Sequence, residues 1–77
     1  MDKVERIREK LRGVIDPETG INVVDMGMIE RITVRGERAK ILFRPTTPGC
    51  PLIAYLVKQV KSAAESVVKN ADVEVLT

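Results

Sequence analysis

The stretch IERITVRGERAKILFR, residues 29–44, decides the fold of this 77-residue chain. Apolar and polar side chains alternate on both sides of its centre, as is typical of strands with one buried face. The centre, Arg35-Gly-Glu-Arg38, has the composition of a hairpin turn. The stretch therefore predicts two antiparallel strands, whose inward-facing side chains are expected to be Met28, Ile32, Val34, Ala39, Ile41 and Phe43.

A helical pattern precedes this hairpin. Asp2 followed by Glu5 is a capping-box pattern, and the apolar residues after it recur at helical spacing. We expect a helix over roughly residues 3–12, ended by Gly13.

A longer helical pattern follows the hairpin, from Pro51 to about Lys69. Asn70 can adopt the left-handed conformation that ends a helix, and Val73 to Leu76 is then a short closing strand. The predicted order is α-β-β-α-β in a single domain spanning residues 1–77. A two-layer α+β sandwich accommodates this order, with both helices on one face of a three-stranded mixed sheet. A right-handed crossover makes the last strand parallel to the second, and the remaining strand order stays open.

The connection between the first helix and the hairpin contains two turn signals. Asp16 before Pro17, with Gly20 closing the segment, is typical of a turn, and Gly27 permits a tight bend. Its apolar residues are expected to pack against the core; they are Ile21, Val23 and Val24.

The composition is that of a globular, soluble domain, with 44% hydrophobic and 31% charged residues. The net charge of +2 is too small to demand a nucleic-acid partner. A single cysteine excludes an internal disulfide and favours a reducing compartment, the cytoplasm. The charged start of the chain argues against a signal peptide, and no apolar run is long enough to span a membrane.

The single cysteine, Cys50, lies where the second helix is expected to begin. With Pro51 at the first helical position, Cys50 falls at the N-cap, where the amides of Leu52 and Ile53 would point towards its sulfur. Those amides and the helix dipole favour thiolate over thiol. The alternative is that Cys50 merely replaces the usual serine at a helix start.

Other polar side chains are candidates to join Cys50 in one site. Thr46 and Thr47 precede it, and Asp16 and Glu18 flank Pro17; Asp25 is a further candidate. Carboxylates would raise the pKa of the thiol, but a bound cation removes that conflict, and this donor set suits iron or zinc. Alternatively, Asp16 caps its own turn and Glu18 is a solvated loop residue.

Residue types limit the chemistry further. One thiolate cannot hold an iron–sulfur cluster, which usually takes four ligands, so a cluster would be shared with a second copy or a partner, or only passed on. Catalysis by the thiol is disfavoured, because the chain has no histidine to act as its base.

The outward face of the hairpin is basic. It could meet RNA or an acidic partner, but RNA-binding sheets stack bases on aromatic side chains, and Phe43 is expected to face inwards. An ordinary solvated face is the favoured interpretation. The residues of this face are Arg31, Thr33, Arg35, Lys40, Leu42 and Arg44.

Three motifs together resemble a known family. Asp16-Pro-Glu18, INVVDMGMI at 21–29 and TTPGCP at 46–51 resemble the small iron–sulfur cluster assembly domain family, whose members include the SUF-pathway T protein and the phenylacetate-degradation D protein. The resemblance implies an α+β fold and a role in maturing iron–sulfur proteins. It also implies a site of Asp16, Glu18, Thr46, Thr47 and Cys50, with Cys50 as the reactive or metal-facing thiol.

The sequence therefore predicts an accessory factor for iron–sulfur cluster assembly or targeting, and not an enzyme. Cys50 would contact iron or an iron–sulfur cluster transiently, and the partners would be other assembly proteins or client proteins. A homodimer is one way to complete the ligand set, and no membrane or nucleic-acid partner is expected. The alternative is a metal-free interaction module that docks on a client or assembly protein.

Overall fold

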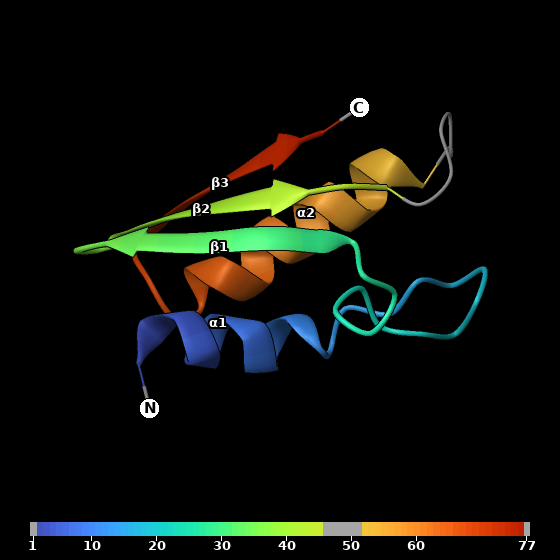
Figure 1. Ribbon diagram of the computed structural model, residues 1–77, viewed down its shortest axis with the longest axis horizontal. Helices are drawn as coiled ribbons and strands as arrows, with labels where there is room; N and C mark the ends of the chain where they lie inside the picture. Colours follow the sequence, from blue (N-terminus) through green and yellow to red (C-terminus); the bar gives the residue numbers. More distant parts are fainter. Residues whose placement is uncertain (1, 46–51, 77) are drawn as a thin grey trace.

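A hairpin and a parallel strand build a three-stranded sheet, and two helices cover one of its faces (Figure 1). The computed structural model describes residues 2–45 and 52–76. The predicted α-β-β-α-β order and α+β class are confirmed. The elements are α1 (Lys3–Leu11), β1 (Ile29–Arg35), β2 (Arg38–Phe43), α2 (Ile53–Glu65) and β3 (Asn70–Val75).

Strand β2 lies at the centre of the sheet, which answers the question of strand order left open by the sequence. It pairs antiparallel with β1 and, as predicted, parallel with β3. Ile41 stands opposite Ile32 on one side and Val73 on the other, so the three strands place apolar side chains in one row. The β1–β2 register shifts between Ile29 and Arg31.

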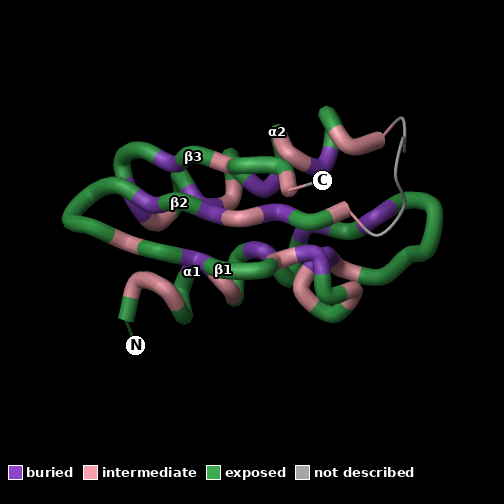
Figure 2. The backbone as a smooth tube through the Cα atoms, turned by 45° about the horizontal axis from the view of Figure 1, so that its top comes forward, coloured by how far each residue is buried: buried purple, intermediate pink, exposed green. Residues whose placement is uncertain are grey.

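The inward face of the sheet and both helices share one apolar core, drawn as the buried segments of Figure 2. The expected inward positions of the hairpin are buried, with Ile41 and Phe43 fully enclosed, and Val34 is partly buried. Across the described ranges, neither helix is long and apolar enough to cross a membrane. The side chains that the helices bury in this core are Ile7, Leu11, Leu56, Val60 and Ala64.

Helix α1 begins as its capping pattern predicts. The Asp2 side chain accepts a hydrogen bond from the Glu5 N–H (2.8 Å), which satisfies one of the free amides of the first turn. The helix ends one residue earlier than expected, at Leu11. Gly13 follows it without a positive φ, and its N–H donates to the Lys10 carbonyl (3.0 Å) in a tight closing turn.

Helix α2 differs from its predicted bounds at both ends. Leu52 occupies the N-cap without a side-chain hydrogen bond, and the helix begins at Ile53. The predicted capping role of Cys50 falls outside the described residues. At the other end, the Ser66 hydroxyl donates to the Ala63 carbonyl (2.6 Å), and the helix stops at Glu65 although the apolar pattern continues. Asn70 does not take the left-handed conformation, because the sheet recruits it as the first residue of β3.

The connection between α1 and β1 projects beyond the end of the sheet (Figure 1). Val23 is fully buried and Val24 packs against the core, as expected. Ile21 was expected to do the same but is 47% exposed, because it lies in the projecting turn. Gly27 forms the predicted bend with a φ of +77°, a conformation that disfavours other residues.

A polar contact ties the start of α1 to the hairpin turn. The Lys3 ammonium donates to Glu37 Oε1 (2.9 Å) and to the Gly36 carbonyl (3.0 Å). The hydrogen bond from Lys3 and its positive charge lower the pKa of the Glu37 carboxyl below its ordinary value of 4.5. The ionised Glu37 carboxylate therefore stabilises the folded state.

We predict that the buried row of the sheet carries much of the stability. Ile41→Ala should lower the free energy of unfolding by about 2–4 kcal/mol, because it leaves a cavity under the central strand. Leu42→Ala removes a side chain of equal size from the opposite face of β2, where it is only half-buried, and should cost less than half as much. Urea denaturation of both variants measures the difference, and equal losses would contradict the one-sided core.

We also predict a pH dependence from Glu37. Because its pKa is lower in the folded state, its contribution is present above pH 4.5 and is lost as pH falls through the folded-state value. Glu37→Gln should therefore reduce the loss of stability between neutral and acidic pH. Glu65→Gln serves as the control, since Glu65 forms no ion pair within the described residues. Identical acid profiles for Glu37→Gln and wild type would refute the prediction.

Candidate functional site

Asp16 is the buried polar residue of the projecting turn, with only 5% of its surface exposed. Its Oδ1 accepts a hydrogen bond from the Glu18 N–H (2.9 Å), and its carbonyl accepts from the Gly20 N–H (2.7 Å). The Asp16 N–H donates to the Ile21 carbonyl (3.0 Å), which closes the turn. Asp16 thus caps its own turn, the alternative that the sequence favoured for it. This role uses the Oδ1 atom of the carboxylate.

The other two carboxylates of this connection are exposed. Glu18 lies on the outside of the Asp16 turn. Asp25 is held within a neighbouring turn, where its Oδ2 accepts from Asn22 Nδ2 and its N–H donates to Asn22 Oδ1, both at 2.9 Å. Within residues 2–45 and 52–76, no three acidic side chains converge as metal ligands. A site built around Asp16 therefore needs donors from elsewhere.

The remaining predicted donors, Thr46, Thr47 and Cys50, lie outside the described residues. The chain segments on either side of them lie at the same end of the sheet as the Asp16 turn (Figure 1). The Arg44 N–H donates to the Met28 carbonyl (2.7 Å), which fixes the exit of β2 to the end of the projecting connection. The chain thus leaves β2 and enters α2 at the end that carries Asp16.

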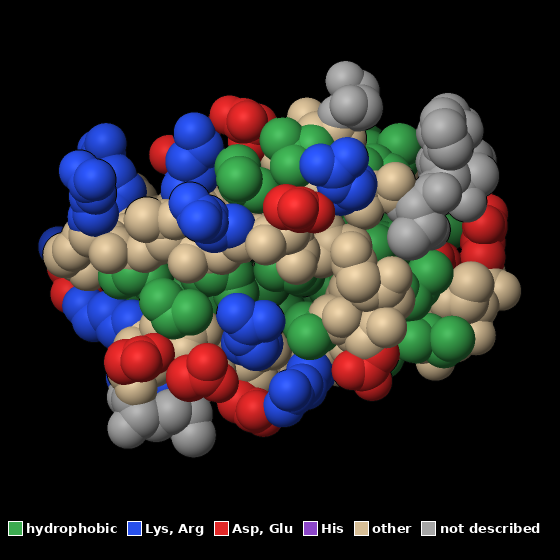
Figure 3. Space-filling view, viewed as in Figure 1, with side chains coloured by type: hydrophobic (Ala, Val, Ile, Leu, Met, Phe, Trp, Pro, Cys, Tyr) green, Lys and Arg blue, Asp and Glu red, His purple; other side chains and the backbone are tan. Residues whose placement is uncertain are grey.

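The outer face of the sheet is the second candidate surface, and Figure 3 looks onto it. Lys and Arg side chains gather at the hairpin end, with acidic side chains among them further along (Figure 3). Two of the basic residues are neutralised, since Lys40 pairs with Glu74 (3.2 Å) and Arg44 with Glu30 (3.1 Å).

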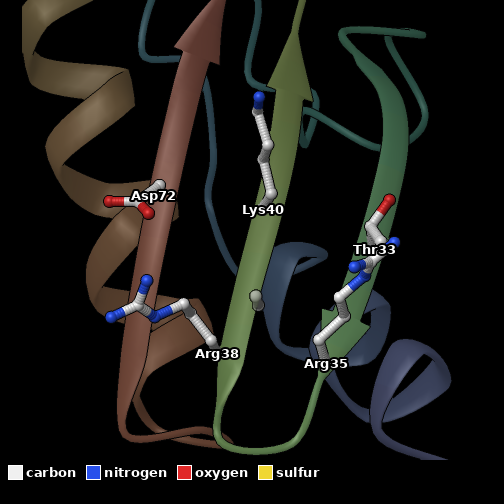
Figure 4. Close-up of a pocket in the computed structure, with 6 residues that line it drawn as sticks. Thr33, Arg35, Arg38, Lys40 and Asp72 are labelled. Carbon is white, nitrogen blue, oxygen red and sulfur yellow. The ribbon is translucent and has the colours of Figure 1, made fainter.

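A shallow hollow lies at the hairpin end of this face (Figure 4). Arg38 is part of it, although the sequence pattern placed this residue in the hairpin turn and not on the basic face. The signal that could have identified Arg38 is its place directly opposite Arg35 across the turn. The hollow is lined by Thr33, Arg35, Arg38, Ala39, Lys40 and Asp72.

Fold and geometry together define a small α+β domain with a buried aspartate at the end of the sheet where β2 ends. A family model described as "Iron-sulfur cluster assembly protein" matches residues 4–77. The chain belongs to this iron–sulfur cluster assembly family, as the three sequence motifs predicted.

Named relatives extend this result. The chain is 38% identical over 65 residues to an iron–sulfur cluster carrier protein of Deinococcus radiodurans, covering 84% of this chain but only 19% of that protein. It is 32% identical over 72 residues to an Fe–S protein maturation auxiliary factor of Bacillus subtilis, covering 92% of this chain and 71% of the relative. A crystal structure of a domain of unknown function from Bacillus anthracis superposes with a TM-score of 0.89 at 28% identity, covering 96% of this chain and 74% of that one.

We predict that the structural role of Asp16 depends on its oxygen and not on its charge. Asp16→Asn retains an acceptor for the Glu18 N–H and should leave the free energy of unfolding nearly unchanged. Asp16→Ala removes the acceptor and should cost about 1 kcal/mol. Urea denaturation of both variants tests this, and an equal loss in both would show that the charge itself holds the turn.

Proposed function

We propose that this chain is an accessory factor in iron–sulfur cluster assembly or targeting, and that Cys50 contacts iron or a cluster transiently. The observation that carries the proposal is the family match over residues 4–77. The names of the relatives, a cluster carrier and a maturation auxiliary factor, support an assembly role that is not enzymatic. We place this role in the cytoplasm, where a single cysteine stays reduced.

The chemistry of the donors agrees with iron as the cargo. Thiolate and carboxylate oxygens are both ligands of iron, and the cation offsets the repulsion between a thiolate and neighbouring carboxylates. In this proposal Cys50 supplies the thiolate, Asp16 and Glu18 supply oxygens, and Thr46 and Thr47 supply hydroxyl groups. The position of the Asp16 turn, at the end of the sheet where the chain passes from β2 to α2, supports this grouping.

The ligand count makes the contact temporary or shared. A cluster usually takes four protein ligands, mostly cysteines, and this chain has one cysteine. We therefore propose that the cluster is held jointly with an assembly or client protein, or with a second copy of this chain. A donor that contributes a single thiolate can release its cargo by ligand exchange, which suits transfer.

We predict that iron loading depends on Cys50. After anaerobic incubation with a mixture of ferrous and ferric iron and with sulfide, and removal of unbound metal, the wild-type protein should retain iron and show visible absorption. Cys50→Ser should retain less than about a tenth of that iron, because a hydroxyl binds iron far more weakly than a thiolate. Metal analysis and absorption spectroscopy measure the loss, and native mass measurement shows whether one or two chains carry the cargo. Unchanged iron content in Cys50→Ser would reject the proposal.

Two further variants separate site from scaffold. Asp16→Asn keeps the turn and removes a charge, so a reduced iron content in this variant would report a direct role of the carboxylate. Glu65→Gln is the control, because Glu65 is exposed at the C-terminal end of α2 and is not a candidate ligand; equal losses in both variants would point to a general charge effect. The alternative is a metal-free interaction module. In that case the Cys50→Ala variant would bind its partners as tightly as the wild-type protein does, and the wild-type protein itself would retain no iron.

A further inference from the structure

The outer face of the sheet is not needed for the core, because both helices pack on the opposite face. It nevertheless carries a concentration of positive charge around the hollow at the hairpin end (Figure 4). Arg31, Arg35 and Arg38 form no ion pair with any residue in the described ranges. These three arginines are the cations of this face that remain available to a partner.

The positions of two of these arginines lower the stability of the hairpin. Arg35 and Arg38 stand directly opposite each other in the β1–β2 register, and like charges in that position destabilise a strand pair. Their side chains lean apart, Arg35 towards Thr33 on β1 and Arg38 towards Asp72 on β3 (Figure 4). The hollow lies between them, so a negatively charged group placed there would be attracted by both and would relieve their repulsion.

The chemistry of the face favours carboxylates over a nucleic acid. The chain has two aromatic residues, Phe43 in the core and Tyr55 on α2. The outer face of the sheet therefore has no aromatic ring on which a base could stack. Asp72 and Glu74 on β3 would repel a continuous phosphate backbone laid across the sheet. A short acidic segment can instead run along β1, so that only one of its carboxylates reaches Arg38 in the hollow that Asp72 also lines.

We propose that this outer face docks an acidic, extended segment of a partner protein. Outward-facing residues recur along a strand at intervals of about 7 Å, so an extended segment with a carboxylate at every second position matches their spacing. One carboxylate would bind between Arg35 and Arg38, where guanidinium groups can each donate two hydrogen bonds, and another would reach Arg31. Thr33 supplies a further hydroxyl donor at the edge of the hollow. None of these residues belongs to the proposed iron site, and the docking does not depend on metal.

Fluorescence anisotropy with a short labelled peptide carrying glutamate at every second position tests this proposal. We expect binding that weakens as salt concentration rises, and no binding of the matching glutamine peptide. Arg35→Gln/Arg38→Gln should weaken binding about tenfold. Arg6→Gln/Lys10→Gln removes the same charge from exposed positions of α1 and should change the affinity less than about twofold.

Each alternative outcome overturns the proposal. Equal losses in the two double variants would mean that only net charge matters, and tight binding of the glutamine peptide would exclude a role for carboxylates. A labelled single-stranded RNA that binds more tightly than the glutamate peptide, and loses affinity in Arg35→Gln/Arg38→Gln, would assign the face to nucleic acid. Thermal unfolding of the variants confirms that they fold, since removal of the like-charge pair should not lower the midpoint. Cys50→Ser should bind the peptide as wild type does, which separates this inference from the proposed iron contact.

Discussion

One-sided packing of the sheet is the constraint on which the molecule depends. A chain of 77 residues buries only about 60% of the surface that its unfolded form exposes, so it can support one core and no more. Ile41 and Phe43 on the central strand place that core against both helices. The other sheet face is thereby left to solvent, and its residues are free to be selected for purposes other than stability. The small size of the domain thus accounts for a sheet with one buried and one exposed face.

The same topology sets the position of the candidate site. A parallel strand cannot follow β2 through a tight turn, so the chain must cross the sheet through α2. The connection from β2 to α2 then lies at the carboxyl end of the central strand, and the α1–β1 connection with its Asp16 turn lies at the same end. The path of the backbone thus brings segments distant in sequence to one end of the sheet, and the hydrogen bond from the Arg44 N–H to the Met28 carbonyl joins them there.

Local patterns predicted what local physics determines. The two-residue alternation of 29–44 identified both strands and their buried faces, and Asp2 marked the start of α1, because these features depend on neighbours in sequence. The C-terminal end of α2 depends on competition: the Ser66 hydroxyl donates to a helix carbonyl, and Asn70 pairs with β2 in the sheet. The spacing of apolar residues along the chain cannot predict where such a helix ends. Asp16 was predicted both as a turn cap and as a ligand; the cap is confirmed, while its grouping with Thr46, Thr47 and Cys50 stays a prediction because those three lie outside the described residues.

The parallel pairing of β2 with β3 has a consequence for how the domain is made. Arg38 pairs with Asn70, so the ladder joins residues that are far apart in the chain, whereas Arg35 and Arg38 meet across a short turn. Contacts between distant residues close slowly. During synthesis the hairpin can form as soon as Phe43 is available, but one side of its second strand stays without a hydrogen-bonding neighbour until residues 70–75 have emerged. During that interval the nascent domain exposes an unpaired strand edge, on which another strand can pair wrongly. This partly folded state is one that a chaperone could bind.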